Sequence, residues 1–364
     1  MKKRYFFFYI ITIIILIFFI EIISFGLLKL NQSNNKNLFI DNFQVRDFTE
    51  RTNDERLITM KKNFNKKEID SVNEVKEKTW SIFTSNFRTR ISETRFASGN
   101  KIDIEKTNKS KILFIGDSVP FGMGVDAESS LPFIFGNKNS KYLSINGAIP
   151  SYSLKQSVER FIIEFKKIKN LKYVYIQVYD PASQYAILGS KWNEIDNWTN
   201  RSDQVLRRYG SLKNLLDLKI PFYGKIYFFT VIKKLIVKIH GHKIFFSLPT
   251  EESDKRYILH IQSQLKKLLN HLETTNVKLI IAPITIPHIK LMNSDENIDY
   301  HLRAVGIFNK TLKKFSKNKN VHYIDTISIL KEQYEKNFID NCCHLSGSGA
   351  ELVASNLSKI LTNK

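Results

Sequence analysis

From residue 111 onward, short apolar runs alternate with longer stretches of helical periodicity. The apolar runs fit buried strands, and they lie at 111–115, 142–146, 173–178, 277–283 and 321–325. Apolar positions spaced along one face of a helix fall at 153–168, 254–274, 300–317 and 349–361. Strands that alternate with helices predict right-handed crossovers and a parallel sheet with helices on both faces.

An apolar segment near the N-terminus predicts a membrane anchor. Lys2, Lys3 and Arg4 precede the run Tyr5–Leu28, which only Glu21 and a few small residues interrupt. A helix needs about 20 apolar residues to span a bilayer. The basic residues before the run, and the absence of a cleavage-site pattern after it, favour an uncleaved single-pass helix within residues 1–30 over a signal peptide. The rest of the chain would then lie outside the cytoplasm. Polar flanks argue against the alternative, a buried core helix.

Residues 31–110 are expected to be a linker and an irregular lead-in packed against the main domain. Residues 31–37 read NQSNNKN and form a polar linker without periodicity. The rest is charged and mixed, with a helix predicted around 66–79 and a short strand near 80–83.

Residues 186–250 break the alternation and predict a helical insertion into the domain of residues 111–364. The stretch Ile226–Ile239 is apolar apart from three lysines, and it is too short to cross a bilayer. Two interpretations stay open. The stretch forms a basic amphipathic helix on an anionic membrane surface, or it forms a helical cap over the edge of the sheet, and one segment can do both.

The chain is basic, and its lysines are dispersed. Lys and Arg number 56 against 35 Asp and Glu, which gives a net charge of +21 and a pI of about 9.7. Such a charge favours anionic partners. No dense basic block or nucleic-acid motif is present, so we expect no nucleic-acid partner. Adjacent Cys342 and Cys343 are poorly placed for a disulfide, and no metal-ligand spacing occurs. We therefore expect no metal and no cofactor.

The stretch 111–125, KILFIGDSVPFGMGV, contains a candidate nucleophile. A buried strand is followed by Gly-Asp-Ser, which places Ser118 where open α/β sheets bind ligands. The alternative is an ordinary polar turn after a strand. A second stretch supports the chemical interpretation, because His344 lies in a loop before the last helix and four residues after Asp340. A serine hydroxyl becomes a good nucleophile when an imidazole removes its proton and a carboxylate orients that imidazole.

These two blocks resemble the SGNH/GDSL hydrolase superfamily, over roughly residues 80–363. The resemblance implies a three-layer α/β/α sandwich with Ser118 as nucleophile and His344 as base. It also implies an oxyanion hole built from the amides of Ser118 and of a second-block glycine, together with a third-block asparagine side chain.

Three positions depart from the family pattern. Ser151 stands at the usual second-block glycine, where its amide could still donate a hydrogen bond. Tyr179 stands where the third-block asparagine is expected, and Tyr179 or Gln177 could donate in its place. The family's Asp-x-x-His spacing places the acid at Asn341, one residue after Asp340. A bulge would bring Asp340 to the imidazole, or a backbone carbonyl would orient the ring in a Ser-His dyad.

The leading hypothesis is a membrane-anchored serine esterase that acts outside the cytoplasm on ester bonds of envelope glycans or lipids. An O-acyltransferase of exported polysaccharide, using the same serine, is the alternative. A non-catalytic glycan-binding or envelope-assembly protein on the same fold is the second alternative. Envelope-assembly proteins are candidate partners.

Overall fold

The computed structural model describes residues 12, 16, 19–21, 23, 48–52, 54, 58–70, 79–97, 107–150, 152–178, 251–283, 285, 296–340 and 343–362. By its contacts the chain divides into two units, residues 42–205 with 248–364 and residues 1–41 with 206–247. Every strand and helix named below belongs to the first of these units.

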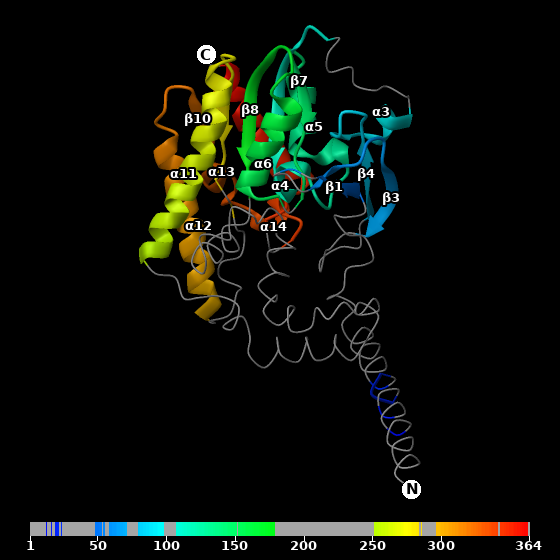
Figure 1. The fold of residues 1–364 in the computed structure, drawn as a ribbon. Coiled ribbons are helices and arrows are strands. Elements are labelled where there is room, and N and C mark those ends of the chain that lie inside the picture. The colour runs from blue at the N-terminus through cyan, green and yellow to red at the C-terminus, as the bar shows by residue number, and fades with distance from the viewer. Residues whose placement is uncertain are drawn as a thin grey trace. The chain divides into compact units, whose positions relative to one another are not determined.

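A mixed eight-stranded sheet forms the centre of this unit (Figure 1). Its order is β10-β9-β8-β6-β7-β5-β4-β3. The five strands from β10 to β7 run parallel, and β5, β4 and β3 continue the sheet in antiparallel pairs. A separate antiparallel ribbon pairs β1 with β2. The strands are β1 (Thr49–Arg51), β2 (Ile58–Met60), β3 (Asn65–Asp70), β4 (Thr79–Thr84), β5 (Arg90–Ile91), β6 (Ser110–Gly116), β7 (Tyr142–Asn146), β8 (Leu171–Gln177), β9 (Lys278–Ile281) and β10 (Val321–Tyr323).

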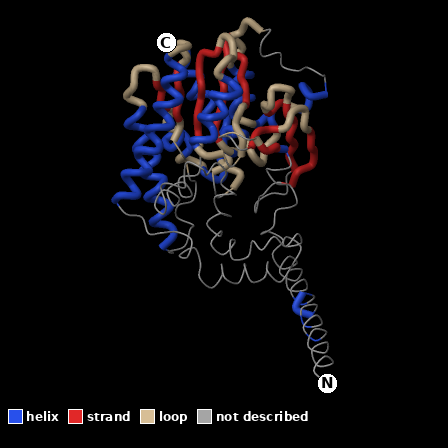
Figure 2. The backbone as a smooth tube through the Cα atoms, viewed as in Figure 1, coloured by secondary structure: helices blue, strands red, loops and turns tan. Residues whose placement is uncertain are grey.

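Helices cover both faces of the parallel part, as Figure 2 shows in blue beside the red strands. Alternate residues of β6 point to opposite faces, as a strand's period of two requires. Leu113 and Ile115 belong to the core with α6, α11 and α12, while Ile112 and Phe114 belong to the core with α5 and α15. The helices are α3 (Glu93–Ala97), α4 (Ser118–Phe121), the 3-10 turn η1 (Ala127–Ser129), α5 (Leu131–Lys138), α6 (Leu154–Arg160), the π-helical turn η2 (Phe161–Phe165), α11 (Glu251–Glu273), α12 (Glu296–Phe315), α13 (Thr326–Leu330), α14 (Tyr334–Asn337) and α15 (Gly347–Thr362).

The alternation predicted from residue 111 is confirmed, and the lead-in is more ordered than predicted. Each of the five apolar runs contains a parallel strand, and each of the four periodic stretches contains a helix. The helix expected around 66–79 is wrong over 66–70, which belong to β3, whereas the strand expected near 80–83 is β4. The sheet is therefore mixed rather than wholly parallel. β3 is an edge strand, and charged side chains are well tolerated on such a strand because its outer side is not paired.

A third apolar cluster joins the early strands to the loops that follow β6 and β7. Phe48, Met60 and Trp80 pack with Phe121 and Tyr152, and all five side chains are buried. The early strands are thus part of the same folded unit as the parallel sheet.

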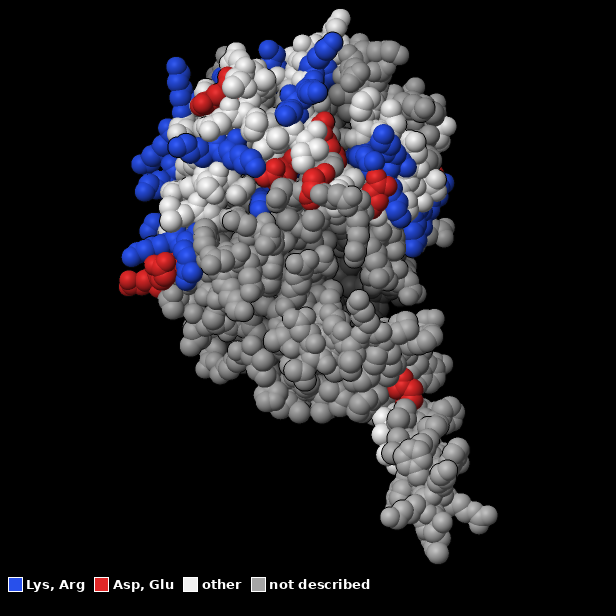
Figure 3. Space-filling view, in the orientation of Figure 1, with Lys and Arg blue, Asp and Glu red and all other residues white. Residues whose placement is uncertain are grey.

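Two predicted segments lie almost wholly outside the described residues: the anchor at 5–28, apart from six positions, and the insertion at 186–250. Among the residues that the structure does describe, no helix is long and apolar enough to cross a membrane. On the face in Figure 3, Lys and Arg are spread over the described surface with acidic residues between them.

Candidate active site

Ser118 begins a one-turn helix directly after the central strand of the parallel sheet. Gly116, at the end of β6, has a φ of +138°, and a Cβ at this position would lie 1.8 Å from the carbonyl oxygen of Gln177 on β8. Only glycine allows this backbone and this close approach. Asp117 is buried and caps α4, because its Oδ1 accepts the Val119 amide at 3.0 Å. The turn that carries Ser118 is therefore defined on both sides of the serine.

The order of strands in the sheet reverses at β6. β6 lies between β7 and β8, so the chain pairs first on one side of β6 and then on the other. In open α/β sheets, a crevice at the carboxyl ends of the strands forms at such a switch point and binds ligands. Ser118 lies at this position.

His344 lies in a narrow loop that backbone hydrogen bonds close. Phe338 and Leu345 form an antiparallel bridge, and the Ile339 amide donates to the carbonyl oxygen of His344 at 2.9 Å. Within the loop, Asp340 Oδ1 accepts the amides of Cys343 at 3.0 Å and of His344 at 3.2 Å. One carboxylate oxygen thus shapes the loop, and the other is left for the imidazole.

Ser118, His344 and Asp340 form a continuous row of hydrogen bonds. The Nε2 of His344 lies 2.8 Å from the Oγ of Ser118, and its Nδ1 contacts the Oδ2 of Asp340. The His344 and Asp340 side chains are only 15% and 14% exposed. Of the two positions that spacing leaves open for the acid, 340 and 341, the carboxylate of Asp340 therefore faces the ring, and Asn341 lies outside the described residues.

The environment of Asp340 favours its charged form. Burial alone would raise the pKa of this carboxyl, but hydrogen bonds from the His344 ring and from two amides outweigh it and hold the pKa below its usual value. An ionised Asp340 accepts a hydrogen bond from the N–H of Nδ1, which leaves the lone pair of Nε2 directed at the serine hydroxyl.

The predicted oxyanion donors are only partly within the described chain. Ser151 and Tyr179 lie outside it. Among the described residues, the Ser118 amide makes no hydrogen bond, so it is available to a developing oxyanion. One of the two N–H donors of the Gln177 side chain is already engaged, because its Nε2 donates to the Pro283 carbonyl at 3.0 Å, and its Oε1 accepts from Tyr175 at 3.0 Å.

Asn146 links the two loops that the family resemblance assigns to the oxyanion hole. Its Nδ2 donates to the Phe121 carbonyl at 3.1 Å, at the end of α4, and its Oδ1 accepts the Ala148 amide at 3.3 Å. The Ile149 amide also donates to the Gly116 carbonyl at 3.1 Å. The loop after β7 is thus bound directly to the turn that carries Ser118.

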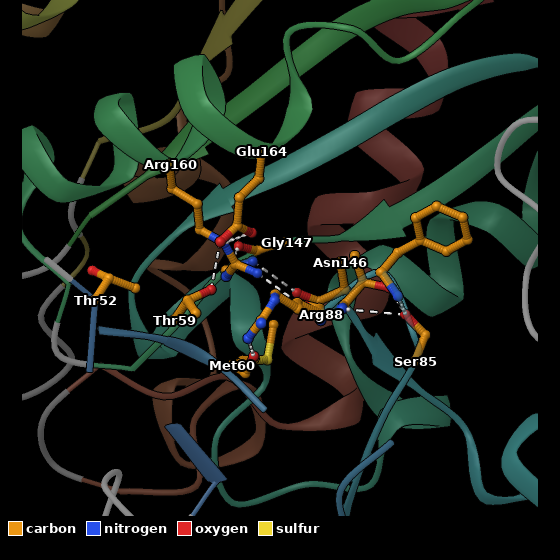
Figure 4. A network of polar contacts seen from close by, with 12 residues as sticks. Thr52, Thr59, Met60, Ser85, Arg88, Asn146, Gly147, Arg160 and Glu164 are labelled. Carbon is orange, nitrogen blue, oxygen red and sulfur yellow. Dashed lines mark hydrogen bonds and ion pairs between the residues drawn. The ribbon is translucent and has the colours of Figure 1, made fainter. Parts of the chain in front are cut away.

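The buried side chain of Arg160, at the end of α6, binds the start of the loop that follows β7 (Figure 4). Arg160 donates to the Gly147 carbonyl at 2.6 Å, to the Arg88 carbonyl at 2.5 Å and to Glu164 Oε2 at 2.9 Å. Thr59 on β2 also donates to Glu164. The sequence did not point to Arg160, because a single arginine in a helical pattern is normally expected to be exposed to solvent.

The described residues contain no group of three or more His, Cys, Asp or Glu side chains placed to hold a metal ion. Cys343, within the His344 loop, is buried and packs in the core with Phe338 and Leu345, and Cys342 lies outside the described residues.

No family model matches the sequence, and no curated protein matches it significantly. Among solved structures, a member of the lipolytic protein G-D-S-L family from Veillonella parvula aligns over 70% of this chain and 100% of its own, with 14% identity and a TM-score of 0.39. A GDSL-like lipase from Bacteroides thetaiotaomicron aligns over 74% of this chain and 97% of its own, with 10% identity and a TM-score of 0.43. An acetyl xylan esterase aligns over 69% of this chain and 99% of its own, with 14% identity and a TM-score of 0.38. The chain is thus similar, at low identity, to GDSL-type lipolytic proteins and esterases.

Proposed function

We propose that this protein is an SGNH-type serine esterase that forms an acyl-enzyme on Ser118. One observation carries the proposal: the row of hydrogen bonds from the Ser118 hydroxyl through the His344 ring to the Asp340 carboxylate. Serine, imidazole and carboxylate in this order and orientation activate a hydroxyl for attack on an acyl group.

In the proposed reaction, the Oγ of Ser118 attacks the ester carbonyl while Nε2 of His344 takes the hydroxyl proton. Asp340 stabilises the imidazolium that forms. The Ser118 amide donates to the oxyanion, and Ser151 and Tyr179 are proposed as further donors. His344 then protonates the leaving alcohol. A water molecule, deprotonated by the same ring, releases the acid and restores the serine.

The proposed substrates are esters of acylated envelope glycans or lipids, and the proposed location is the outer side of the cell membrane. The apolar segment 5–28, with three basic residues before it, supports a single-pass anchor. A tethered enzyme acts on what lies near the membrane. The location is tested by adding protease to spheroplasts: we expect loss of the α/β unit, whereas full protection would place it inside the cell.

The esterase activity is tested with the full-length protein in detergent and p-nitrophenyl acetate. We expect Ser118→Ala to reduce release of p-nitrophenol by about 1,000-fold or more, since the nucleophile is lost. Ser316→Ala, which removes an exposed hydroxyl that donates to the Lys313 carbonyl at the end of α12, is the matched control and should keep full activity. Equal rates for wild type and Ser118→Ala would exclude the acyl-enzyme, and with it both catalytic hypotheses.

The acceptor of the acyl group needs a separate measurement. With an added oligosaccharide, mass spectrometry distinguishes an acylated sugar from free acid alone. Free acid alone agrees with the esterase, and acylated sugar would identify an acyltransferase that uses the same serine.

A further inference from the structure

The loop that follows the nucleophile is held from outside the parallel sheet. Residues 121–126, here called the post-nucleophile loop, connect α4 to the turn η1. Their backbone is tied to the nucleophile, because the Met123 amide donates to the Ser118 carbonyl at 3.1 Å. A displacement of this loop would therefore move Ser118.

The side chain of Arg90, on β5, donates hydrogen bonds to three backbone carbonyls of this loop. One of its terminal nitrogens donates to the carbonyls of Phe121 at 2.7 Å and Gly122 at 2.5 Å. The other donates to Val125 at 2.5 Å and to Ser81 of β4 at 3.0 Å. Arg90 is 4% exposed, and its three bonds to Phe121, Gly122 and Val125 are buried, whereas the bond to Ser81 is partly buried.

Two aromatic rings pack against the Arg90 guanidinium, and Ser81 makes a further polar contact with the loop. The guanidinium carbon lies 4.7 Å from the centre of the Phe121 ring and 5.4 Å from that of Trp80. Ser81 binds the far end of the loop, with its amide and hydroxyl donating to Asp126 Oδ1 at 2.9 and 2.8 Å. The strand pair β4–β5 thus contacts the loop from its first residue to its last.

We propose that Arg90 is a positioning residue for Ser118, and that β4–β5 is a clamp that sets the nucleophile and its amide in their reactive geometry. This proposal rests on the proposed esterase function and deepens it. The guanidinium is suited to the task because its planar fork of donors reaches several carbonyls at once, which a lysine ammonium cannot do in the same geometry. Burial lowers the pKa of Arg90 to about 9, so the side chain stays charged at neutral pH.

The test compares Arg90→Lys with wild type in the full-length protein in detergent. We measure the rate at which a fluorophosphonate probe labels Ser118, and the hydrogen exchange of amides 118–126. We expect labelling to slow about 10-fold or more, since small displacements of a reacting group cost large factors in rate. Exchange in the post-nucleophile loop should rise, while the midpoint of the pH–rate profile stays the same because the His344–Asp340 pair is untouched. Arg303→Lys is the matched control, because Arg303 is exposed and pairs with Asp254 at the surface.

If Arg90→Lys does not fold, Asp126→Ala provides the second variant. Asp126 is exposed, and its loss removes both Ser81 contacts without emptying the core. We expect labelling to slow several-fold and loop exchange to rise. A folded variant that labels at the wild-type rate overturns the positioning role. Failure of the wild type to label at all contradicts the esterase instead, and the exchange measurement then still tests the clamp.

Discussion

Among single side chains, Asp340 determines the orientation of the His344 ring. Its Oδ2 contacts Nδ1, and its Oδ1 accepts two loop amides. We expect Asp340→Asn to lower kcat by about 1,000- to 10,000-fold, because an amide can hold the ring in the wrong tautomer. The measurement is hydrolysis of p-nitrophenyl acetate. Asp254→Asn, at an exposed ion pair on α11, should keep its activity. Wild-type activity in Asp340→Asn would mean that a Ser118–His344 dyad suffices.

The same carboxylate also links stability to pH. The pKa of Asp340 is lower in the folded protein than its ordinary value of 3.8. Its contribution to stability is therefore complete above the unfolded value and is lost as the pH falls through the lower, folded value. We expect the urea midpoint of the wild type to fall in that acidic range more steeply than that of Asp340→Asn. Parallel curves for the two proteins would show that the carboxylate carries no such linkage.

Gly116 is the backbone position on which the nucleophile turn depends. A methyl group at this residue would overlap the Gln177 carbonyl, and its φ is positive. We expect Gly116→Ala to lower the free energy of unfolding by about 1–3 kcal/mol and to slow labelling of Ser118. Urea denaturation measures the first effect. Gly306→Ala is the control, because no atom lies within 4 Å of the added methyl in helix α12, and it should be neutral or raise stability by up to about 1 kcal/mol.

At the scale of elements, the parallel strands were predictable and the antiparallel ones were not. The residues 112–115 are continuously apolar because β6 is buried on both faces. β3 reads NKKEID, and this charged edge strand has no apolar run to mark it. β5 has only two residues, too few for any periodicity to show. Burial and pairing with distant strands determine these elements, and local sequence does not contain that information.

The contact of α6 with the early strands depends on one buried side chain. Arg160 is fully buried and joins Glu164, Gly147 and Arg88 (Figure 4). We expect Arg160→Met to lower the free energy of unfolding by about 3–5 kcal/mol, because it removes the charged partner of the largely buried Glu164 and leaves the carbonyls of Gly147 and Arg88 without this donor. Thermal and urea denaturation measure the loss. The double variant Arg160→Met, Glu164→Gln should recover part of it, and a double variant no better than the single one would contradict this explanation.

For the molecule as a whole, the sequence pointed to the two side chains that meet, Ser118 and His344, but not to the contacts that support them. Each lies in a short motif whose residues are neighbours in the chain, and the family resemblance drew attention to both. Asp340 was less certain, because only the closed loop shows that its carboxylate, one residue before the expected position, turns toward the ring. Arg90 and Arg160 were not predicted at all. Apart from Glu164, four residues after Arg160, the acceptors of their hydrogen bonds are backbone carbonyls of residues far away in the chain, and every residue type has such a carbonyl.

The separation of Ser118 from His344 has a consequence for synthesis. The two residues are 226 positions apart in the chain, yet their side chains share a hydrogen bond. A growing polypeptide therefore contains the hydroxyl long before it contains the imidazole. Without that base, a serine hydroxyl is a weak nucleophile. Fragments that stop short of residue 344 lack this imidazole, so the reactivity proposed for Ser118 would arise only after the sheet, its helices and the His344 loop have all been made.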